Sequence, residues 1–349
     1  MTRILSVIAL VALAARAQEP TLKVGSDAPP LSIAKWLKGD AVTLEKGKIY
    51  VVDFWSTSDE SAMSRLSELQ DTYAGKVTFI GVTTAGEDNT LEAVEAMVKD
   101  KGPAMGYAVA WDDGAKSTSA WLTAAGVKEP PCSFIVDGSG KITYFSHPLV
   151  LDFPLARLVA GKWDPVKGPA EMAAGFRRVN EILQMDRGMA LAAFPAFEKE
   201  YPELAATEAI QSKAARSLPA AKFRMLLLSG KNEEATALGT KLCEKAVKYN
   251  DSTTLNEVAW LIVDPEMKIV KRDLDLAMNA ATKAVEFSKG ENASILDTLA
   301  RVHYWKGDLA KAIEIQTKAV ELAQGDQDEV DALQPTLDQY RAEAAAKKE

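Results

Sequence analysis

The residues that could do chemistry are few, because the chain of 349 residues has only two cysteines and two histidines. Cys132 is the candidate thiol. It follows Pro130 and Pro131 in a loop that also carries Lys128 and Glu129. A thiol that is exposed and near positive charge can act as a nucleophile, whereas a buried one behaves as a small apolar residue. Both interpretations stay open here, and burial at the start of a strand is the favoured one.

No metal site and no cofactor is expected. His147 stands beside Pro148, and no second metal-ligand candidate is near it in the sequence. A structural zinc site needs four Cys, His or carboxylate ligands, usually in close pairs. The same scarcity of cysteine excludes a disulfide-rich scaffold.

A second group of candidates follows an apolar segment at residues 48–55, which predicts a strand buried on both faces. Asp53 lies within this strand, and burial should raise its pKa. Thr57 and Glu60 then have the spacing of a capping box, which predicts that a helix begins here. The residues that continue the helical spacing are Met63, Leu66, Leu69 and Tyr73.

The rest of residues 20–163 alternates between strand and helix patterns. Turn and breaker residues separate the segments, and residues 137–140 predict the turn of a hairpin. This alternation predicts a mixed sheet with helices on both faces. The expected segments are a strand at 77–82, helices at 91–101 and 117–125, strands at 133–136 and 141–146, and a helix at 155–160.

Three motifs in this region, in the same order, resemble the thioredoxin fold and more closely its TlpA/redoxin (AhpC/TSA-like) branch of exported thiol–disulfide proteins. Asp53-Phe54-Trp55-Ser56-Thr57 resembles the segment before the redox motif. Residues 126–134 resemble the cis-proline loop, and residues 137–142 resemble the Asp-x-x-Gly-Lys hairpin. The resemblance covers about residues 22–163, and it implies an α/β thioredoxin-like domain.

The chain departs from the family pattern where the redox motif is expected. Asp59, Glu60, Ser61 and Ala62 stand in place of Cys-x-x-Cys, and no cysteine lies between residues 18 and 131. Thiol–disulfide exchange needs a thiolate and a second thiol that resolves the mixed disulfide. We therefore expect a degenerate site, in which Asp59 and Glu60 stabilise the first turn of the helix.

The resemblance also implies roles for neighbouring residues. Asp53 matches the buried carboxylate that accepts a proton from the resolving thiol. Without such a thiol, a hydrogen-bonded buried acid is the favoured interpretation. Pro131 matches the cis-proline. The loop of Pro130, Pro131 and Cys132 would offer backbone groups to an extended peptide, which requires no thiol.

Residues 164–349 predict an all-α domain of helical repeats. Thr-Lys-x-x-Glu recurs at residues 240, 282 and 317, and the units lie at about 220–250, 255–290 and 292–325. A period near 34 resembles tetratricopeptide repeats, which stack into a curved array. Such arrays usually bind a peptide or protein in their groove. The alternative is that these helices only rigidify the first domain. Residues 169–222 are helical in composition but cannot be assigned to units.

The N-terminus has the pattern of a secretory signal peptide. A positive start at residues 1–3 precedes an apolar run at 4–15 and a small-x-small site at 15–17. We expect a mature chain from residue 18 that is exported, is periplasmic in a cell with two membranes, and has no membrane insertion. The net charge of −8 argues against a nucleic-acid partner.

The expected organisation is therefore a signal peptide at 1–17, a thioredoxin-like domain at 18–163 and a repeat domain at 164–349. The favoured hypothesis is a non-catalytic protein of the cell envelope that binds peptides or proteins or acts as a scaffold. The alternative is a thiol–disulfide oxidoreductase or peroxiredoxin-like enzyme that acts through Cys132 alone.

Overall fold

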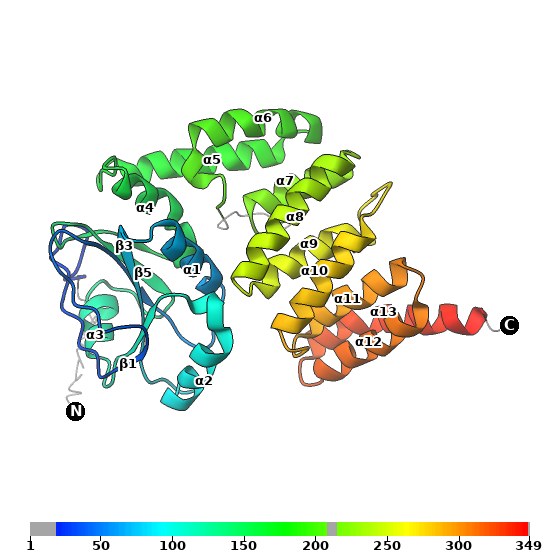
Figure 1. The fold of residues 1–349 in the computed structure, drawn as a ribbon, viewed down its shortest axis with the longest axis horizontal. Helices are drawn as coiled ribbons and strands as arrows, with labels where there is room; N and C mark the ends of the chain where they lie inside the picture. The colour runs from blue at the N-terminus through cyan, green and yellow to red at the C-terminus, as the bar shows by residue number, and fades with distance from the viewer. Residues whose placement is uncertain (1–18, 208–214, 348–349) are drawn as a thin grey trace, which may run out of the picture.

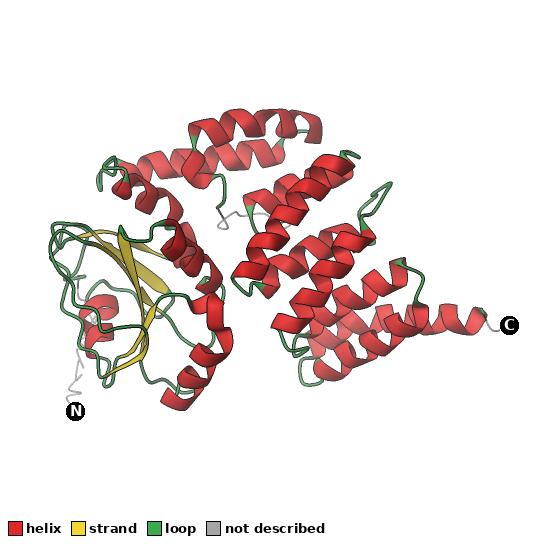
Figure 2. Cartoon of the chain, viewed as in Figure 1, coloured by secondary structure: helices red, strands yellow, loops and turns green. Residues whose placement is uncertain are grey.

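The computed structural model describes residues 19–207 and 215–347, so the expected signal peptide at 1–17 lies outside the described residues. A sheet with its helices occupies residues 19–159 and is called here the α/β part. Residues 168–346 form the helical part, which extends away from the sheet (Figures 1 and 2). None of the described helices combines the length and the apolar character that crossing a membrane requires.

The α/β part is built on one mixed sheet in the order β1-β4-β3-β2-β5-β6. β2, β3 and β4 are parallel, and the other three strands join antiparallel. The two crossovers in the parallel core run through helices, as parallel connections require. The strands are β1 (Lys35–Lys38), β2 (Ile49–Phe54), β3 (Val77–Thr83), β4 (Ala108–Trp111), β5 (Cys132–Val136) and β6 (Ile142–Ser146).

Helices cover both faces of this sheet, which confirms the predicted architecture. One face packs Val51, Phe79 and Val109 under α1, α2 and α4. The other face packs Val52 and Phe134 under the segment α3–η2 and neighbouring loops. The helical segments are α1 (Met63–Thr72), α2 (Leu91–Lys101), α3 (Lys116–Thr118) and α4 (Asp152–Val159), with the 3-10 turns η1 (Gly102–Met105) and η3 (Pro148–Val150) and the π-helical turn η2 (Ser119–Thr123).

The helical part is a succession of antiparallel helix pairs closed by one long helix. Side chains at the start of several helices, such as Asp251, Asp273 and Asn292, accept a hydrogen bond from the backbone N–H three residues on. The elements are α5 (Gly168–Gln184), α6 (Arg187–Glu200), η4 (Pro202–Leu204), α7 (Leu218–Leu228), α8 (Asn232–Lys248), α9 (Ser252–Val263), α10 (Leu274–Phe287), α11 (Ala293–Trp305), α12 (Leu309–Leu322) and α13 (Gln327–Ala346).

The connection between α9 and α10 is longer than its counterpart between α11 and α12, and it is held in place by one arginine. Arg272 donates hydrogen bonds to the backbone oxygens of Asp264 (3.1 Å) and Met267 (2.8 Å). Its guanidinium also lies 4.2 Å from the centre of the Trp305 ring. The extra residues are thus ordered by contacts with the next helix pair.

An apolar cluster joins the two parts of the chain at α4. Phe153 on α4 packs with Val179 on α5, Phe194 and Phe197 on α6, and Leu218 on α7. These side chains are almost completely buried. Arg157 covers the edge of the cluster, because it stacks 4.5 Å from the Phe153 ring centre and pairs with Glu171 at 2.7 Å. This joint therefore has the character of a domain core.

A buried ion-pair network reaches α4 at Asp152, the residue directly before Phe153. Arg65 on α1 is 5% exposed and pairs with both Asp152 and Glu68. Glu68 in turn pairs with Lys245 on α8 at 2.9 Å. Burial raises the pKa of Glu68, but the neighbouring cations outweigh that effect and hold the pKa below its usual range. The network thus connects α4, α1 and α8.

We predict that Arg65→Met lowers the free energy of unfolding by about 3–5 kcal/mol, because it leaves the buried Asp152 carboxylate without its cation, while Glu68 keeps Lys245. The measurement is urea denaturation followed by circular dichroism. Arg178→Met is the matched control, since Arg178 also pairs with a glutamate three residues on but on the exposed surface. It should cost less than about 1 kcal/mol. Equal losses in the two variants would contradict a structural role for the buried network.

Candidate functional site

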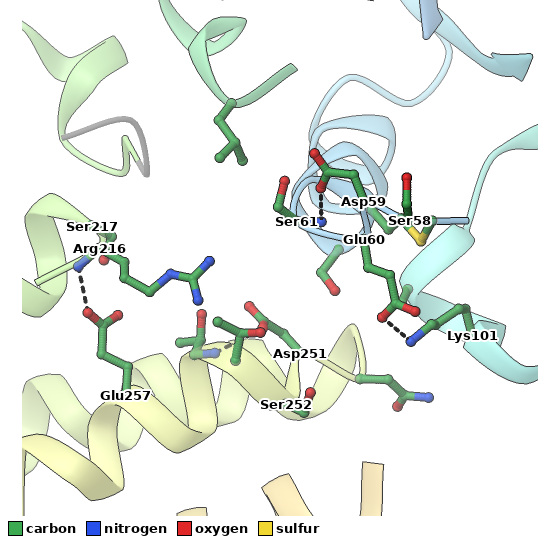
Figure 3. A pocket seen from close by; sticks show the side chains of 17 residues that line it. Ser58, Asp59, Glu60, Ser61, Lys101, Arg216, Ser217, Asp251, Ser252 and Glu257 are labelled. Atoms are coloured by element: carbon green, nitrogen blue, oxygen red, sulfur yellow. Dashed lines mark hydrogen bonds and ion pairs between the residues drawn. The ribbon is translucent and has the colours of Figure 1, made fainter. Parts of the chain in front are cut away.

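A polar cavity of about 520 Å³ lies between the α/β part and the helical part. One wall is the segment that precedes α1, residues 58–61, which we call the site loop. The other wall is the start of α9 and the residues before α7 (Figure 3). The lining includes residues 58–61, Met63, Ser64, Lys101, 216–217, 250–254 and Glu257. The sequence-predicted degenerate motif therefore does face a cavity.

The predicted helix start within this loop is wrong. α1 begins at Met63, and Ala62 precedes it without a side-chain cap. The backbone N–H of Thr57 donates instead to Asn89 Oδ1 at 2.9 Å. Asp59 Oδ1 accepts from the N–H of Ser61 at 2.8 Å, which closes a local turn. Because the capping groups are engaged in this way, residues 57–62 form turns.

Asp59 and Glu60 consequently do not lie in the first turn of α1, which contains no acidic residue. The expected stabilisation of that turn by their charges is therefore also wrong. Glu60 pairs with Lys101 at the end of α2. Ala62 is buried, whereas Ser61 is exposed and lines the cavity. These side chains offer hydrogen bonds and charge to a ligand, and they contain no nucleophilic thiol.

Asp53 lies under the site loop and is 3% exposed. Burial raises its pKa to about 7, the hydrogen bond from Ser133 lowers the pKa somewhat, and the charge of Asp59 raises it. Ser133 Oγ donates to Asp53 Oδ1 at 2.5 Å across the β2–β5 pair. The expected buried acid with a raised pKa is found, and it has one strong donor.

Two further polar groups near Asp53 were not predicted from the sequence. Burial raises the pKa of Tyr107 well above its usual value, and the charge of Asp53 adds a smaller effect in the same direction. Among the described residues, neither the Tyr107 hydroxyl nor Trp55 Nε1 has a hydrogen-bond partner. Both rings pack against Gly81, where a Cβ would lie 2.9 Å from Tyr107 Cε2 and 3.0 Å from Trp55 Nε1. Only glycine fits at that position.

Cys132 begins β5 and is 4% exposed. Burial and, to a smaller extent, the charge of Asp53 raise the pKa of its thiol to about 12. A thiol with such a pKa is protonated at neutral pH and is a poor nucleophile. The favoured interpretation of Cys132 as a buried strand residue therefore agrees with its position.

The bond between Pro130 and Pro131 is cis, as the resemblance implied. Both prolines are half-buried. Neither they nor Cys132 are among the residues that line the cavity. The cis-proline loop and the site loop lie at the same end of the sheet. The cavity, however, is lined by the site loop and the helical part, and not by the cis-proline loop.

The contribution of the helical part to the site was missed by the sequence reasoning. Arg216 points its guanidinium into the cavity (Figure 3), and its backbone N–H donates to Glu257 Oε1 at 2.6 Å. Burial raises the pKa of Glu257. Asp251 accepts from the N–H of Thr254 at 2.9 Å and so begins α9 at the cavity wall. The only available signal was the cluster of helix-start residues at 251–254.

No group of three or more His, Cys, Asp or Glu side chains that could hold a metal ion occurs within residues 19–207 and 215–347. Cys243, the second thiol, is half-buried against the core of α7–α11, and burial raises its pKa to about 12. The arrangement at the cavity can therefore bind a polar ligand by hydrogen bonds and charge.

No family model matches the chain. It is 29% identical over 152 residues to Protein FixW of Rhizobium leguminosarum, and the match covers 41% of this chain and 69% of that protein. Similar solved structures include a thioredoxin-like protein in its oxidised form (20% identity, 39% of this chain, 97% of that chain, TM-score 0.35). They also include a thiol-disulfide isomerase from Corynebacterium glutamicum (18%, 38%, 97%, TM-score 0.32).

The α/β part has a thioredoxin-like fold. Its parallel β2–β3–β4 core, the antiparallel β5–β6 hairpin and the helices on both faces are the features of that fold. A largely helical region follows it. Within the α/β part the sequence has a single cysteine, Cys132, and the site loop contains none.

We predict that Asp53→Asn removes the loss of stability that the Asp53 carboxyl imposes as pH rises from 3.8 to about 7, so that the variant gains stability relative to the wild type across that window. The unfolded chain releases this proton near 3.8 and the folded chain near 7, so the folded state is disfavoured above both values. The melting temperature measured against pH tests this. Asp88→Asn, at an exposed position, is the control. A variant that follows the wild-type profile would contradict the prediction.

Proposed function

We propose that this protein is exported and uses a thioredoxin fold to bind a polypeptide segment, without exchanging disulfides. The observation that carries the proposal is the polar cavity. It lies at the position of the redox motif and is closed by the helical part. The segment that aligns with the redox motif thus faces the cavity. Its side chains are Asp59, Glu60, Ser61 and Ala62.

The absence of catalysis is supported by the thiols. Asp59 and Ala62 occupy both cysteine positions of the motif, so neither the attacking nor the resolving thiol is present. Cys132 is buried, and the pKa of its thiol is raised to about 12. The alternative, an oxidoreductase or peroxiredoxin-like enzyme that works through Cys132, would require this side chain to become exposed and ionised.

Binding of an extended segment is supported by two further cavities that adjoin the first. A cavity of about 460 Å³ along α7 and α9 shares Arg216, Thr253 and Glu257 with it. A cavity of about 730 Å³ between α2 and α10–α11 shares Glu60 and Lys101 with it. The three cavities share lining residues, and we call them together the cleft. A cleft of this kind suits a chain with many backbone hydrogen-bonding groups.

The remaining parts of the proposal rest on the sequence. The repeats at about 220–250, 255–290 and 292–325 correspond to the pairs α7–α8, α9–α10 and α11–α12, which supports a tetratricopeptide-like array. The pattern at residues 1–17 supports export to the periplasm or its equivalent. We propose a domain division near residue 163, with the peptide held between the site loop and the array.

We predict that the purified protein does not accelerate the reduction of insulin by dithiothreitol. The physical reason is that the only thiol near the site is buried and protonated. The measurement is insulin turbidity with the wild type and with Cys132→Ser. Turnover that disappears in Cys132→Ser would instead support the alternative enzyme.

We predict that peptides selected from a random displayed library bind in the cleft. Ser61→Trp should weaken selected peptides at least about tenfold, or about 1.4 kcal/mol, because the indole fills the cavity beside the site loop. Ser139→Trp, at the exposed hairpin turn on the far end of the sheet, is the matched control and should leave affinity unchanged. Fluorescence anisotropy of the labelled peptides measures both. Failure to enrich any peptide, or equal binding by both variants, would contradict the proposal.

A further inference from the structure

The two contacts between the α/β part and the helical part differ in chemistry. The joint at α4 is an apolar cluster that includes Phe153 and Phe194, both fully buried. The contact between α1 and the end of α8 is polar (Figure 1). Among the described residues, no buried apolar cluster combines side chains of α1 or α2 with side chains of α8–α13.

Three ion pairs join the α/β part to the helical part on this polar side, from α1 to α8 and from α2 to the residues after α10. In each pair the cation belongs to the helical part and the carboxylate belongs to the α/β part. The pairs are Lys245 with Glu68 (2.9 Å), Lys248 with Asp71 (2.7 Å) and Lys289 with Asp100. We call these six side chains the clasp.

Among the described residues, two further hydrogen bonds support the clasp at α1. Tyr249 donates its hydroxyl to Asp71 at 3.1 Å, and Ser64 donates to the backbone oxygen of Tyr249 at 3.2 Å. Two of the three ion pairs are exposed, since the side chains of Lys248 and Asp71 are 61% and 53% exposed. The third pair, Lys245 with Glu68, is partly buried. Exposed ion pairs are weak individually and are screened by salt. Polar contacts of this kind between parts of one chain permit relative motion.

The clasp lies beside the cavity. Ser64 lines the cavity and contacts Tyr249, which is followed by the lining residues Asn250 and Asp251. Separation of α8 from α1 would therefore move the start of α9 away from the site loop. The apolar joint at α4 stays closed in such a motion and acts as its hinge.

We propose that the clasp is an ionic latch: when it opens, the helical part swings about the α4 joint and widens the space between the site loop and the start of α9 for an incoming polypeptide. The proposal rests on the proposed function for the identity of the ligand, and it adds the control of access to that site. With the clasp closed, the part of the cleft beside the site loop has about 520 Å³, the size of a small-molecule pocket, so a polypeptide that reaches its buried lining needs the wider opening. Ionic strength then sets the fraction of open molecules.

The test uses the full chain with Ala104→Cys as a reporter, because Ala104 lines the cavity and is only 3% exposed while the clasp is closed. The rate of its reaction with a polyethylene-glycol maleimide too large for the cavity is divided by the rate with N-ethylmaleimide, which removes effects of salt on the thiol itself. This ratio should rise about tenfold when the salt concentration goes from about 10 mM to about 1 M, which shortens the Debye length from ~30 Å to ~3 Å. The parent chain, with its native thiols, supplies the background rate.

The control reporter is Ser139→Cys in the exposed hairpin turn, whose ratio should not change with salt. Adding Lys248→Glu to the Ala104→Cys reporter should raise the ratio at low salt to the level seen at high salt. Adding Asp71→Lys to that variant should restore the low ratio, because it recreates the pair with exchanged charges. A general loss of folding would not be reversed in this way.

A ratio for Ala104→Cys that is independent of salt would overturn the latch, as would a charge exchange that fails to restore the low ratio. These measurements need no peptide, so they can fail while the selected peptides still bind in the cleft. Conversely, a salt-dependent latch without any peptide binding would overturn the proposed function and leave the motion established.

Discussion

The geometry of the site depends on one buried cation. The Arg65 guanidinium lies between Asp152 of α4 and Glu68 of α1, and Glu68 also holds Lys245 of α8. The site loop ends just before α1, so its position is set by whatever fixes that helix. A buried guanidinium with two carboxylates has a defined geometry because its donors form a rigid fork. The network thus orients the site loop through α1, and through Lys245 it contacts α8 of the helical part.

The proposed site contains a buried acid although the site loop has no thiol. Asp53 lies under the site loop with a pKa raised to about 7 by burial, and near it the Tyr107 hydroxyl has no hydrogen-bond partner among the described residues. A buried acid of this kind costs stability once it ionises. Its hydrogen bond from Ser133 joins the central strand to β5 and offsets part of that cost. Asp53 therefore contributes to the pairing of β2 with β5 and, when it ionises, to the electrostatic potential at the site loop.

Much of the fold could be predicted from the sequence because its signals are local. The β2 and β3 strands, α2 and the β5–β6 hairpin follow from apolar runs and turn residues. β1 and β4 were missed because each has only four residues. The start of α1 was misplaced because Asn89, which binds the backbone of Thr57, is distant in sequence. The cavity could not be predicted for the same reason. About half of its lining comes from residues 216–257, and a local sequence pattern does not show that this segment lies against the site loop.

The chemistry of the two interfaces explains how one chain can have both a firm connection and an accessible site. An apolar joint at α4 opens only at the cost of exposing large side chains such as Phe153 and Phe197 to water. The ion pairs at α1 can exchange protein partners for water and salt at little cost. If both contacts were apolar, the cleft would be a closed interior, and if both were ionic, the two walls would not be held in register. Because the polar contact lies beside the site loop, the mobile side of the interface is also the side where a ligand must enter.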